Sequence, residues 1–171
     1  DELTDPDYAA NSTSRCYFCK RTLWTRLAGV AAERGIAIIA DGSNLDDLHD
    51  HRPGRRATRE ASVASPLIEA GYRKADVREH ARSLGIPIWD APASPCLSSR
   101  VLYGLSITPD RLHQVEGGEA LLRSIGVQGD LRVRHRGNEA RIEVDPAELP
   151  AGREHRAEIG AGLVDLGFSR V

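Results

Sequence analysis

The stretch Ile36-Ala37-Ile38-Ile39-Ala40, followed by Asp41-Gly42, decides the fold class. It is a short, continuous apolar run rich in β-branched residues and it ends at a turn signal, which predicts a strand buried on both faces, as in a parallel sheet. Before it, residues 16–34 repeat apolar side chains at helical spacing and stop at Gly35. A helix, a buried strand and a polar loop in succession predict an α/β fold.

The residues that follow extend this pattern as far as a proline-rich loop. Residues 63–70 and 74–84 predict two helices, and residues 86–89 predict a second short strand. Residues 91–100 form the loop after that strand and contain Cys96. Open α/β sheets place ligand loops after their strands, so this loop is a candidate ligand loop.

The pattern changes beyond residue 104. The expected elements are, in chain order, a helix capped by Thr108-Pro109 and ended by Gly126, a hairpin with strands at 131–136 and 139–144 around Gly137-Asn138, a helix at about 151–166, and the start of a strand at 168–171. We therefore expect an α/β portion over residues 1–104 and a smaller α+β portion over residues 105–171.

Composition restricts the class of protein. The 171 residues are 40% hydrophobic and 28% charged with a net charge of -2, which predicts a globular, cytoplasmic protein and excludes a coiled coil. No apolar run approaches the roughly 20 residues needed to cross a bilayer, and no signal segment opens the sequence. The lack of a basic excess argues against a protein whose main task is to bind nucleic acid.

The hairpin brings charges into pairs. Its turn places Arg134 opposite Arg141 and Arg132 opposite Glu143, all on one side of the ribbon. Like charges directly opposite each other are destabilising, so the two arginines need an anion or another carboxylate between them. Two interpretations remain open: a solvated ladder of salt bridges, or a site where guanidinium groups bind phosphate or carboxylate.

Three cysteines carry the other candidate chemistry. Cys16 and Cys19 stand three residues apart at the predicted helix start, where both thiols share a face and gain thiolate character from the helix dipole. In a reducing compartment this spacing indicates a metal, a cluster or redox chemistry, with inert buried thiols as the alternative. With Cys96 the set suits a [4Fe-4S] cluster with one open iron, whereas zinc requires a fourth ligand.

Seven motifs then resemble, in order, those of the LarE family of ATP-dependent sulfurtransferases, which belong to the PP-loop pyrophosphatases. They are Asn11-Ser-x-x-Arg-Cys-Tyr-Phe-Cys-Lys20, Asp41-Gly-Ser-Asn-Leu-Asp-Asp47, Asp50-x-Arg-Pro-Gly54, Ser65-Pro-Leu-x-Glu-Ala-Gly71, Lys74-x-x-x-Arg78, Cys96-Leu-Ser-Ser-Arg100, and Arg132-Val-Arg134 through Arg141-Ile-Glu-Val144. The resemblance covers nearly the whole sequence. It implies a PP-loop, Rossmann-type parallel sheet (adenine nucleotide alpha hydrolase-like) in the first portion and a sulfurtransferase domain in the second.

The resemblance implies a two-step reaction on pyridinium-3,5-biscarboxylic acid mononucleotide, in the synthesis of a nickel-pincer cofactor. ATP, with Mg²⁺, adenylates a ring carboxylate, and a sulfur nucleophile then displaces AMP. In single-cysteine members the residue matching Cys96 gives up its own sulfur and becomes dehydroalanine. The presence of Cys16, Cys19 and Cys96 together implies instead a [4Fe-4S] cluster that they ligate. The family also suggests a homo-oligomer.

The residues expected at the site fall into groups. Asp41, Gly42, Asn44 and Asp46 are expected at the nucleotide, because their loop leaves the carboxyl end of the predicted strand. Ser99, Arg100, Arg132 and Arg134 are expected to bind the substrate phosphate, with Glu143 in support. Whether Asp46, His49 or Asp50 contacts a metal stays open. The Ser-Gly-Gly-x-Asp-Ser nucleotide loop of the family is absent, so we expect the sequence to match an inner part of those proteins.

Two other functions remain as alternatives. One is a zinc or redox module that uses the three cysteines without nucleotide chemistry. The other is a PP-loop relative that thiolates tRNA, which the near-neutral charge disfavours.

Overall fold

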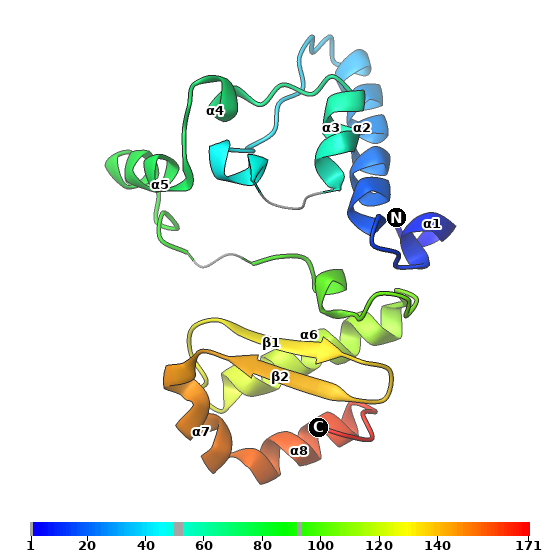
Figure 1. Ribbon diagram of the computed structural model, residues 1–171, viewed down its shortest axis with the longest axis vertical. Helices are drawn as coiled ribbons and strands as arrows, with labels where there is room; N and C mark the ends of the chain where they lie inside the picture. The colour runs from blue at the N-terminus through cyan, green and yellow to red at the C-terminus, as the bar shows by residue number, and fades with distance from the viewer. Residues whose placement is uncertain (1, 50–52, 92–93) are drawn as a thin grey trace. The chain divides into compact units, whose positions relative to one another are not determined.

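The computed structural model describes residues 2–49, 53–91 and 94–171, and the chain folds as two compact units. Unit 1 comprises Asp1–Tyr8 and Thr13–Ala91, and unit 2 comprises Ala9–Ser12 and Pro92–Val171. The ribbon shows helices in both units and a two-stranded sheet in unit 2 (Figure 1). The assignment of residues 1–104 and 105–171 to separate functional domains stays a prediction, because compactness does not assign function.

Helices make up most of unit 1. The regular elements up to residue 91 are the 3-10 helix Glu2–Thr4, α1 (Pro6–Ala9), α2 (Arg15–Glu33), the 3-10 helix Leu45–Leu48, α3 (Gly54–Glu60), α4 (Pro66–Glu69) and α5 (Lys74–Ser83). The helices predicted at 16–34 and 74–84 are confirmed by α2 and α5. The helix predicted at 63–70 is shorter, because Pro66 occupies the first turn of α4 and fixes its start.

The strand predicted at 36–40 is wrong. Ala40 alone pairs, through an isolated parallel bridge to Ala64, while Ile36 and Ile38 are 52% and 71% exposed. A strand needs neighbouring strands that pair with its N–H and C=O groups. Among the described residues, only the segment around Ala64 makes such hydrogen bonds with residues 39–41. Residues 86–89, predicted as a second strand, form no strand, and residues 87–89 lie in turns. The fold is mixed α/β, and its described part contains one two-stranded sheet.

Close contact between α2 and α3 organises unit 1. A β-carbon added at Gly54 would lie 3.2 Å from the carbonyl oxygen of Cys16 and 3.0 Å from Cγ of Lys20. The first residue of α3 therefore packs directly on the turn of α2 that carries Cys16. Trp24, Ala57 and Val63 form the buried core beside this contact.

Unit 2 packs helices against a hairpin. Its elements are the 3-10 helix Leu97–Arg100, α6 (Pro109–Ser124), β1 (Leu131–His135), β2 (Ala140–Val144), the 3-10 helix Pro146–Glu148, α7 (Leu149–Glu154) and α8 (Arg156–Asp165). The core comprises Leu122, Val127, Leu131, Val133, Ala140, Ile159, Leu163 and Phe168. Gly118 of α6 lets β1 approach, since a β-carbon there would lie 3.2 Å from both methyl groups of Val133.

The hairpin confirms its predicted register. Arg134 pairs with Arg141 and Arg132 with Glu143, and Gly137 in the turn has a positive φ of 78°. The helix predicted to begin after Thr108 is also confirmed. The hydroxyl of Thr108 accepts a hydrogen bond from the N–H of Arg111 at 3.3 Å and so caps α6.

The C-terminal predictions are only partly right. The helix expected at 151–166 is two helices, α7 and α8, that meet at His155. The strand expected at 168–171 makes only an isolated parallel bridge, between Arg170 and Glu139. Across the described residues, no helix is both long and apolar enough to cross a membrane.

Candidate functional site

The loop that carries Cys96 is held by the side chain of Arg100. Arg100 is only 5% exposed, and its Nη1 donates to the carbonyl oxygens of Pro95 and Cys96, the latter at 3.1 Å. The same nitrogen donates to Oγ of Ser99 at 3.2 Å. Cys96 itself is an exposed, free cysteine. Arg100 thus fixes the backbone on both sides of Cys96 and leaves its thiol accessible.

Glu119 of α6 holds Arg100 in turn. Its Oε1 accepts from Nε of Arg100 at 2.9 Å and from the N–H of Val133 at 3.3 Å, and its side chain is 13% exposed. Glu119 was not among the residues predicted from the sequence. The available signal is the pair Gly117-Gly118 just before it, because glycines inside a helix indicate close approach by a neighbouring element.

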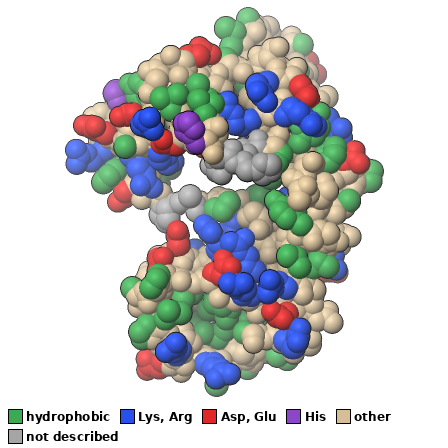
Figure 2. Space-filling view, in the orientation of Figure 1, with side chains coloured by type: hydrophobic (Ala, Val, Ile, Leu, Met, Phe, Trp, Pro, Cys, Tyr) green, Lys and Arg blue, Asp and Glu red, His purple; other side chains and the backbone are tan. Residues whose placement is uncertain are grey.

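Arg134 connects the hairpin to the same loop. Its Nε donates to Oε2 of Glu143 at 2.8 Å, and its Nη1 donates to the carbonyl oxygen of Ser99 at 3.0 Å. Oε1 of Glu143 lies 3.6 Å from Nε of Arg141. Glu143 is therefore the carboxylate that separates the two facing arginines. The space-filling view shows Lys and Arg side chains gathered on unit 2 with acidic side chains among them (Figure 2).

Arg132 is placed differently from the other predicted phosphate ligands. It lines a small hollow of about 220 Å³ together with Asp130, Glu143 and Asp145. Among the residues that the structure describes, no ion pair or hydrogen bond occupies its guanidinium group. The structure thus joins Ser99, Arg100 and Arg134 through one hydrogen-bonded network and leaves Arg132 beside it.

Cys16 and Cys19 lie in the first turn and a half of α2, in unit 1. Both are half-buried and free of disulfides. Nη2 of Arg15, a residue only 3% exposed, lies 3.9 Å from Sγ of Cys16 and donates toward it. Within the described ranges of each unit, no three His, Cys, Asp or Glu side chains gather in a way that could hold a metal ion. The three-cysteine ligand set spans both units and stays a prediction.

The loop expected to border the nucleotide is held by its own side chains. Asp41 accepts from the N–H and hydroxyl of Ser43 at 3.1 and 2.8 Å and from the hydroxyl of Ser65 at 2.8 Å. Burial alone would raise the pKa of Asp41, but these hydrogen bonds outweigh it and lower the pKa. Gly42 has open space around its α-carbon, which leaves room for a ligand at the backbone.

Asn44 and Asp46 have structural partners. The side chain of Asn44 accepts a hydrogen bond from the N–H of Asp46 at 3.0 Å. Asn44 is the N-cap residue of the 3-10 helix Leu45–Leu48 and forms a capping box there. Asp46 accepts from the N–H of Lys74 at 2.8 Å and from Nη1 of Arg73 at 3.1 Å, so it binds the start of α5. The hydrogen bond from Lys74 is the main reason that the pKa of Asp46 is lowered. His49 ends that 3-10 helix, and Asp50 lies outside the described residues.

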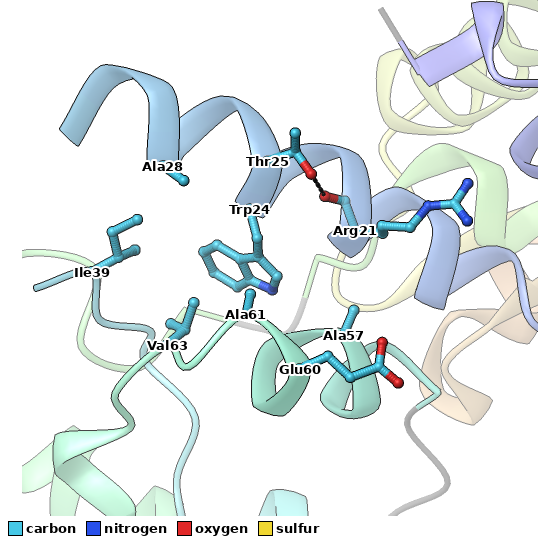
Figure 3. Close-up of a pocket in the computed structure, with 9 residues that line it drawn as sticks. All are labelled: Arg21, Trp24, Thr25, Ala28, Ile39, Ala57, Glu60, Ala61 and Val63. Atoms are coloured by element: carbon cyan, nitrogen blue, oxygen red, sulfur yellow. Dashed lines mark hydrogen bonds between the residues drawn. The ribbon is translucent and has the colours of Figure 1, made fainter. Parts of the chain in front are cut away.

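A cavity of about 410 Å³ opens between α2 and α3 (Figure 3). Trp24 lies at its centre and donates its indole N–H to Oγ1 of Thr58 at 3.2 Å. The charged side chains at its edge are Arg21 and Glu60, which pair with Asp5 and Arg56. The lining is otherwise mainly small and apolar, so the cavity extends the core of unit 1 and offers no reactive group.

Comparison with known proteins places the chain among a small set of relatives. No protein-family model matches it. It is 44% identical over 149 residues to an uncharacterised protein of Synechocystis, 37% identical over all 171 residues to pyridinium-3,5-bisthiocarboxylic acid mononucleotide synthase of Lactiplantibacillus plantarum, and 34% identical over 161 residues to an uncharacterised protein of Methanocaldococcus jannaschii. The chain spans 55%, 62% and 62% of the length of these relatives.

Proposed function

Because the chain belongs to the family of pyridinium-3,5-bisthiocarboxylic acid mononucleotide synthases, the LarE family, we propose that it is the sulfur-transferring part of such an enzyme. Its substrate would be pyridinium-3,5-biscarboxylic acid mononucleotide, and its product would enter nickel-pincer cofactor synthesis. The observation that carries the proposal is the 37% identity over all 171 residues.

The proposed reaction has two steps. A ring carboxylate of the substrate attacks the α-phosphorus of ATP, and pyrophosphate leaves. Sulfur then attacks the acyl carbon, the bond to AMP breaks, and a thiocarboxylate results once the sulfur is free of its donor. ATP and Mg²⁺ belong to the proposal through the family resemblance.

Both proposed versions of the sulfur-transfer step require Cys96. Its thiol is exposed while its backbone is fixed by Arg100, as a reactive group on a positioned loop requires. Either Cys96 attacks the acyl-adenylate and loses its sulfur by elimination, which leaves dehydroalanine, or it ligates a cluster. Only a thiolate performs either task.

The three cysteines are of the residue type that ligates an iron-sulfur cluster. None of the three is in a disulfide, and two of them lie three residues apart at the start of α2. We propose Cys16, Cys19 and Cys96 as ligands of a [4Fe-4S] cluster, which when bound would supply sulfide at its open iron. Arg15 would hold the sulfur of Cys16 in place.

We extend the proposal to the fold of unit 1. A PP-loop parallel sheet would pair the exposed run at 36–40 with strands that lie outside these 171 residues. The parallel sense of the bridge between Ala40 and Ala64 and the exposure of Ile36 and Ile38 support it. Asp41, Gly42, Asn44 and Asp46 would then border the nucleotide, with Gly42 offering backbone access.

The substrate phosphate completes the proposal. Ser99, Arg132 and Arg134 are its proposed direct ligands, with Arg100 in support and Glu143 holding Arg134 in orientation. Among the described residues, the guanidinium group of Arg132 makes no hydrogen bond or ion pair. We therefore propose that Arg132 contacts the substrate phosphate directly. Arg100 is deeply buried and would act by shaping the loop. A homo-oligomer is proposed from the family alone.

The proposal is tested by incubating the anaerobically purified protein with ATP and pyridinium-3,5-biscarboxylic acid mononucleotide. Thiocarboxylate, AMP and pyrophosphate are the expected products, and iron with acid-labile sulfide is expected in the protein. Bound zinc and no thiocarboxylate would favour the metal or redox module instead. Thiolation of tRNA but not of the mononucleotide would favour the tRNA-modifying alternative.

A further inference from the structure

Asn11 is buried in a conformation that few residue types adopt. It has no exposed surface and a positive φ of 52°, the left-handed region that asparagine tolerates better than most side chains. Its neighbours along the chain, from Ala9 to Ser12, pack as part of unit 2, although the residues before and after them belong to unit 1. The chain therefore enters unit 2 for four residues and leaves it again just before α2.

The side chain of Asn11 fills a turn of unit 2. Its Nδ2 donates to the carbonyl oxygens of Leu105, Leu102 and Val101 at 2.8, 2.9 and 3.3 Å. These carbonyl oxygens converge on one buried point, and the Asn11 amide supplies the donor that they share.

The backbone of the same segment adds two further links. The N–H of Gly104 donates to the carbonyl oxygen of Asn11 at 3.0 Å, and that of Ile107 donates to Ala9 at 2.8 Å. The turn is itself anchored, because the N–H of Leu102 donates to the carbonyl oxygen of His135 at the end of β1. Asn11 is thus attached to the sheet of unit 2.

We infer that Asn11 is a positioning residue, a clasp that fixes on the Cys96-bearing unit the point from which the helix carrying Cys16 and Cys19 begins. Cys16 is the fourth residue after Ser12, so their Cα atoms lie within about 14 Å of each other. While residues 9–12 are held in unit 2, this short tether keeps the effective concentration of Cys16 and Cys19 near unit 2 high. Release of residues 9–12 would lengthen the tether and lower that concentration. The consequence for sulfur transfer rests on the proposed function, but the clasp itself does not.

Two variants of the full chain separate the amide from the backbone. Asn11→Asp keeps the shape and sets a carboxylate against three carbonyl oxygens, and Asn11→Gly keeps the left-handed backbone accessible without any donor. Ser62→Gly is the matched control, because Ser62 has a φ of 54° but is exposed in a turn of unit 1.

Spin labels report the clasp directly. With Cys16, Cys19 and Cys96 replaced by serine, labels at Ala32→Cys on α2 and Ala120→Cys on α6, both exposed, give a distance distribution between the two units. We expect a broader distribution in both Asn11 variants than in the parent, and no broadening in Ser62→Gly. Distributions of equal width in the parent and in both Asn11 variants would overturn the inference. A lowered melting temperature with an unchanged distribution shows a purely structural role and also overturns it.

Iron analysis of the chain with its native cysteines tests the functional consequence separately. Both Asn11 variants should lose iron and acid-labile sulfide that Ser62→Gly retains. A parent without iron contradicts the proposed cluster and leaves the spin-label result to decide the clasp. Full iron content in variants whose distance distribution has broadened would overturn the link between the clasp and the cysteines.

Discussion

The guanidinium group of Arg100 and the carboxylate of Glu119 form an ion pair of 2.9 Å that is almost completely removed from solvent. Arg100 belongs to the loop of Cys96, and Glu119 belongs to the middle of α6. The ion pair therefore fixes the loop that carries the exposed thiol against α6. Two hydrogen bonds from the same guanidinium group to backbone carbonyl oxygens complete this link.

Glu119→Gln should strongly destabilise unit 2. The substitution leaves a buried guanidinium group without its counter-charge, and breaking a buried pair in this way costs about 3 kcal/mol. Urea unfolding measures the loss, and Glu116→Gln on the exposed face of the same helix should change stability by less than about 0.5 kcal/mol. The rate at which Cys96 reacts with a thiol reagent should also change in Glu119→Gln alone. Equal stabilities of the two variants would contradict the structural role of the pair.

Local signals account for the parts of the fold that were predicted from the sequence. The hairpin followed from Gly137-Asn138 and the helix from Thr108-Pro109, because a turn or a cap is determined by residues that are adjacent in the chain. The run at 36–40 was wrongly predicted as a strand, since a strand forms only where a neighbour completes its hydrogen bonds. Glu119 and Asn11 were missed as structural anchors because their partners lie 19 and about 90 residues away.

Gly54→Ala should destabilise unit 1 by about 1–3 kcal/mol. The new methyl group would lie 3.2 Å from a backbone oxygen, that of Cys16, which cannot move without shifting α2. Gly29→Ala is the control, because no atom lies within 4 Å of the position where its β-carbon would be, and alanine favours the interior of α2 by about 0.5–1 kcal/mol. Urea unfolding should move in opposite directions for the two variants. Stabilisation by both would show that α3 does not contact α2 at Cys16.

The stability of unit 2 should fall as the pH falls from 7.5 to 5.5. His135 is 2% exposed, and burial, aided by the positive charge of Arg111, lowers the pKa of its imidazole below the usual 6.5. The unfolded chain therefore takes up a proton at a higher pH than the folded chain, so lowering the pH through this window favours unfolding. His135→Gln should flatten the dependence measured by urea unfolding at several pH values. The aspartates with lowered pKa values, such as Asp41, act only below this window. A dependence that is just as steep in His135→Gln would contradict the assignment.

Arg134→Lys should weaken binding of the proposed mononucleotide substrate by about tenfold or more. Arg134 already uses two directions of its guanidinium group, toward Glu143 and Ser99, and a lysine cannot reproduce that planar arrangement. Binding is measured by calorimetry with the substrate and with its dephosphorylated form. Arg136→Lys is the control, since Arg136 lies at the hairpin turn and pairs loosely with Glu139 at 3.7 Å. If Arg134→Lys binds both forms as the parent does, Arg134 has no role at the phosphate.

The fate of Cys96 during one turnover should distinguish the two sulfur donors. We expect Cys96→Ala to abolish product formation under either mechanism, because the exposed thiol at this position is either the donor or a cluster ligand.

If Cys96 gives up its own sulfur, then Cys16→Ala and Cys19→Ala keep a single turnover, and the intact protein becomes lighter by the mass of hydrogen sulfide. If the three cysteines hold a cluster, both variants lose iron and activity, the parent turns over repeatedly with added sulfide, and its mass is unchanged. Intact-protein mass spectrometry after a single-turnover reaction measures the difference, with Ser98→Ala in the same loop as the control for loop damage. We expect no mass loss in the parent, and dehydroalanine at position 96 would overturn the cluster in favour of the sacrificial cysteine.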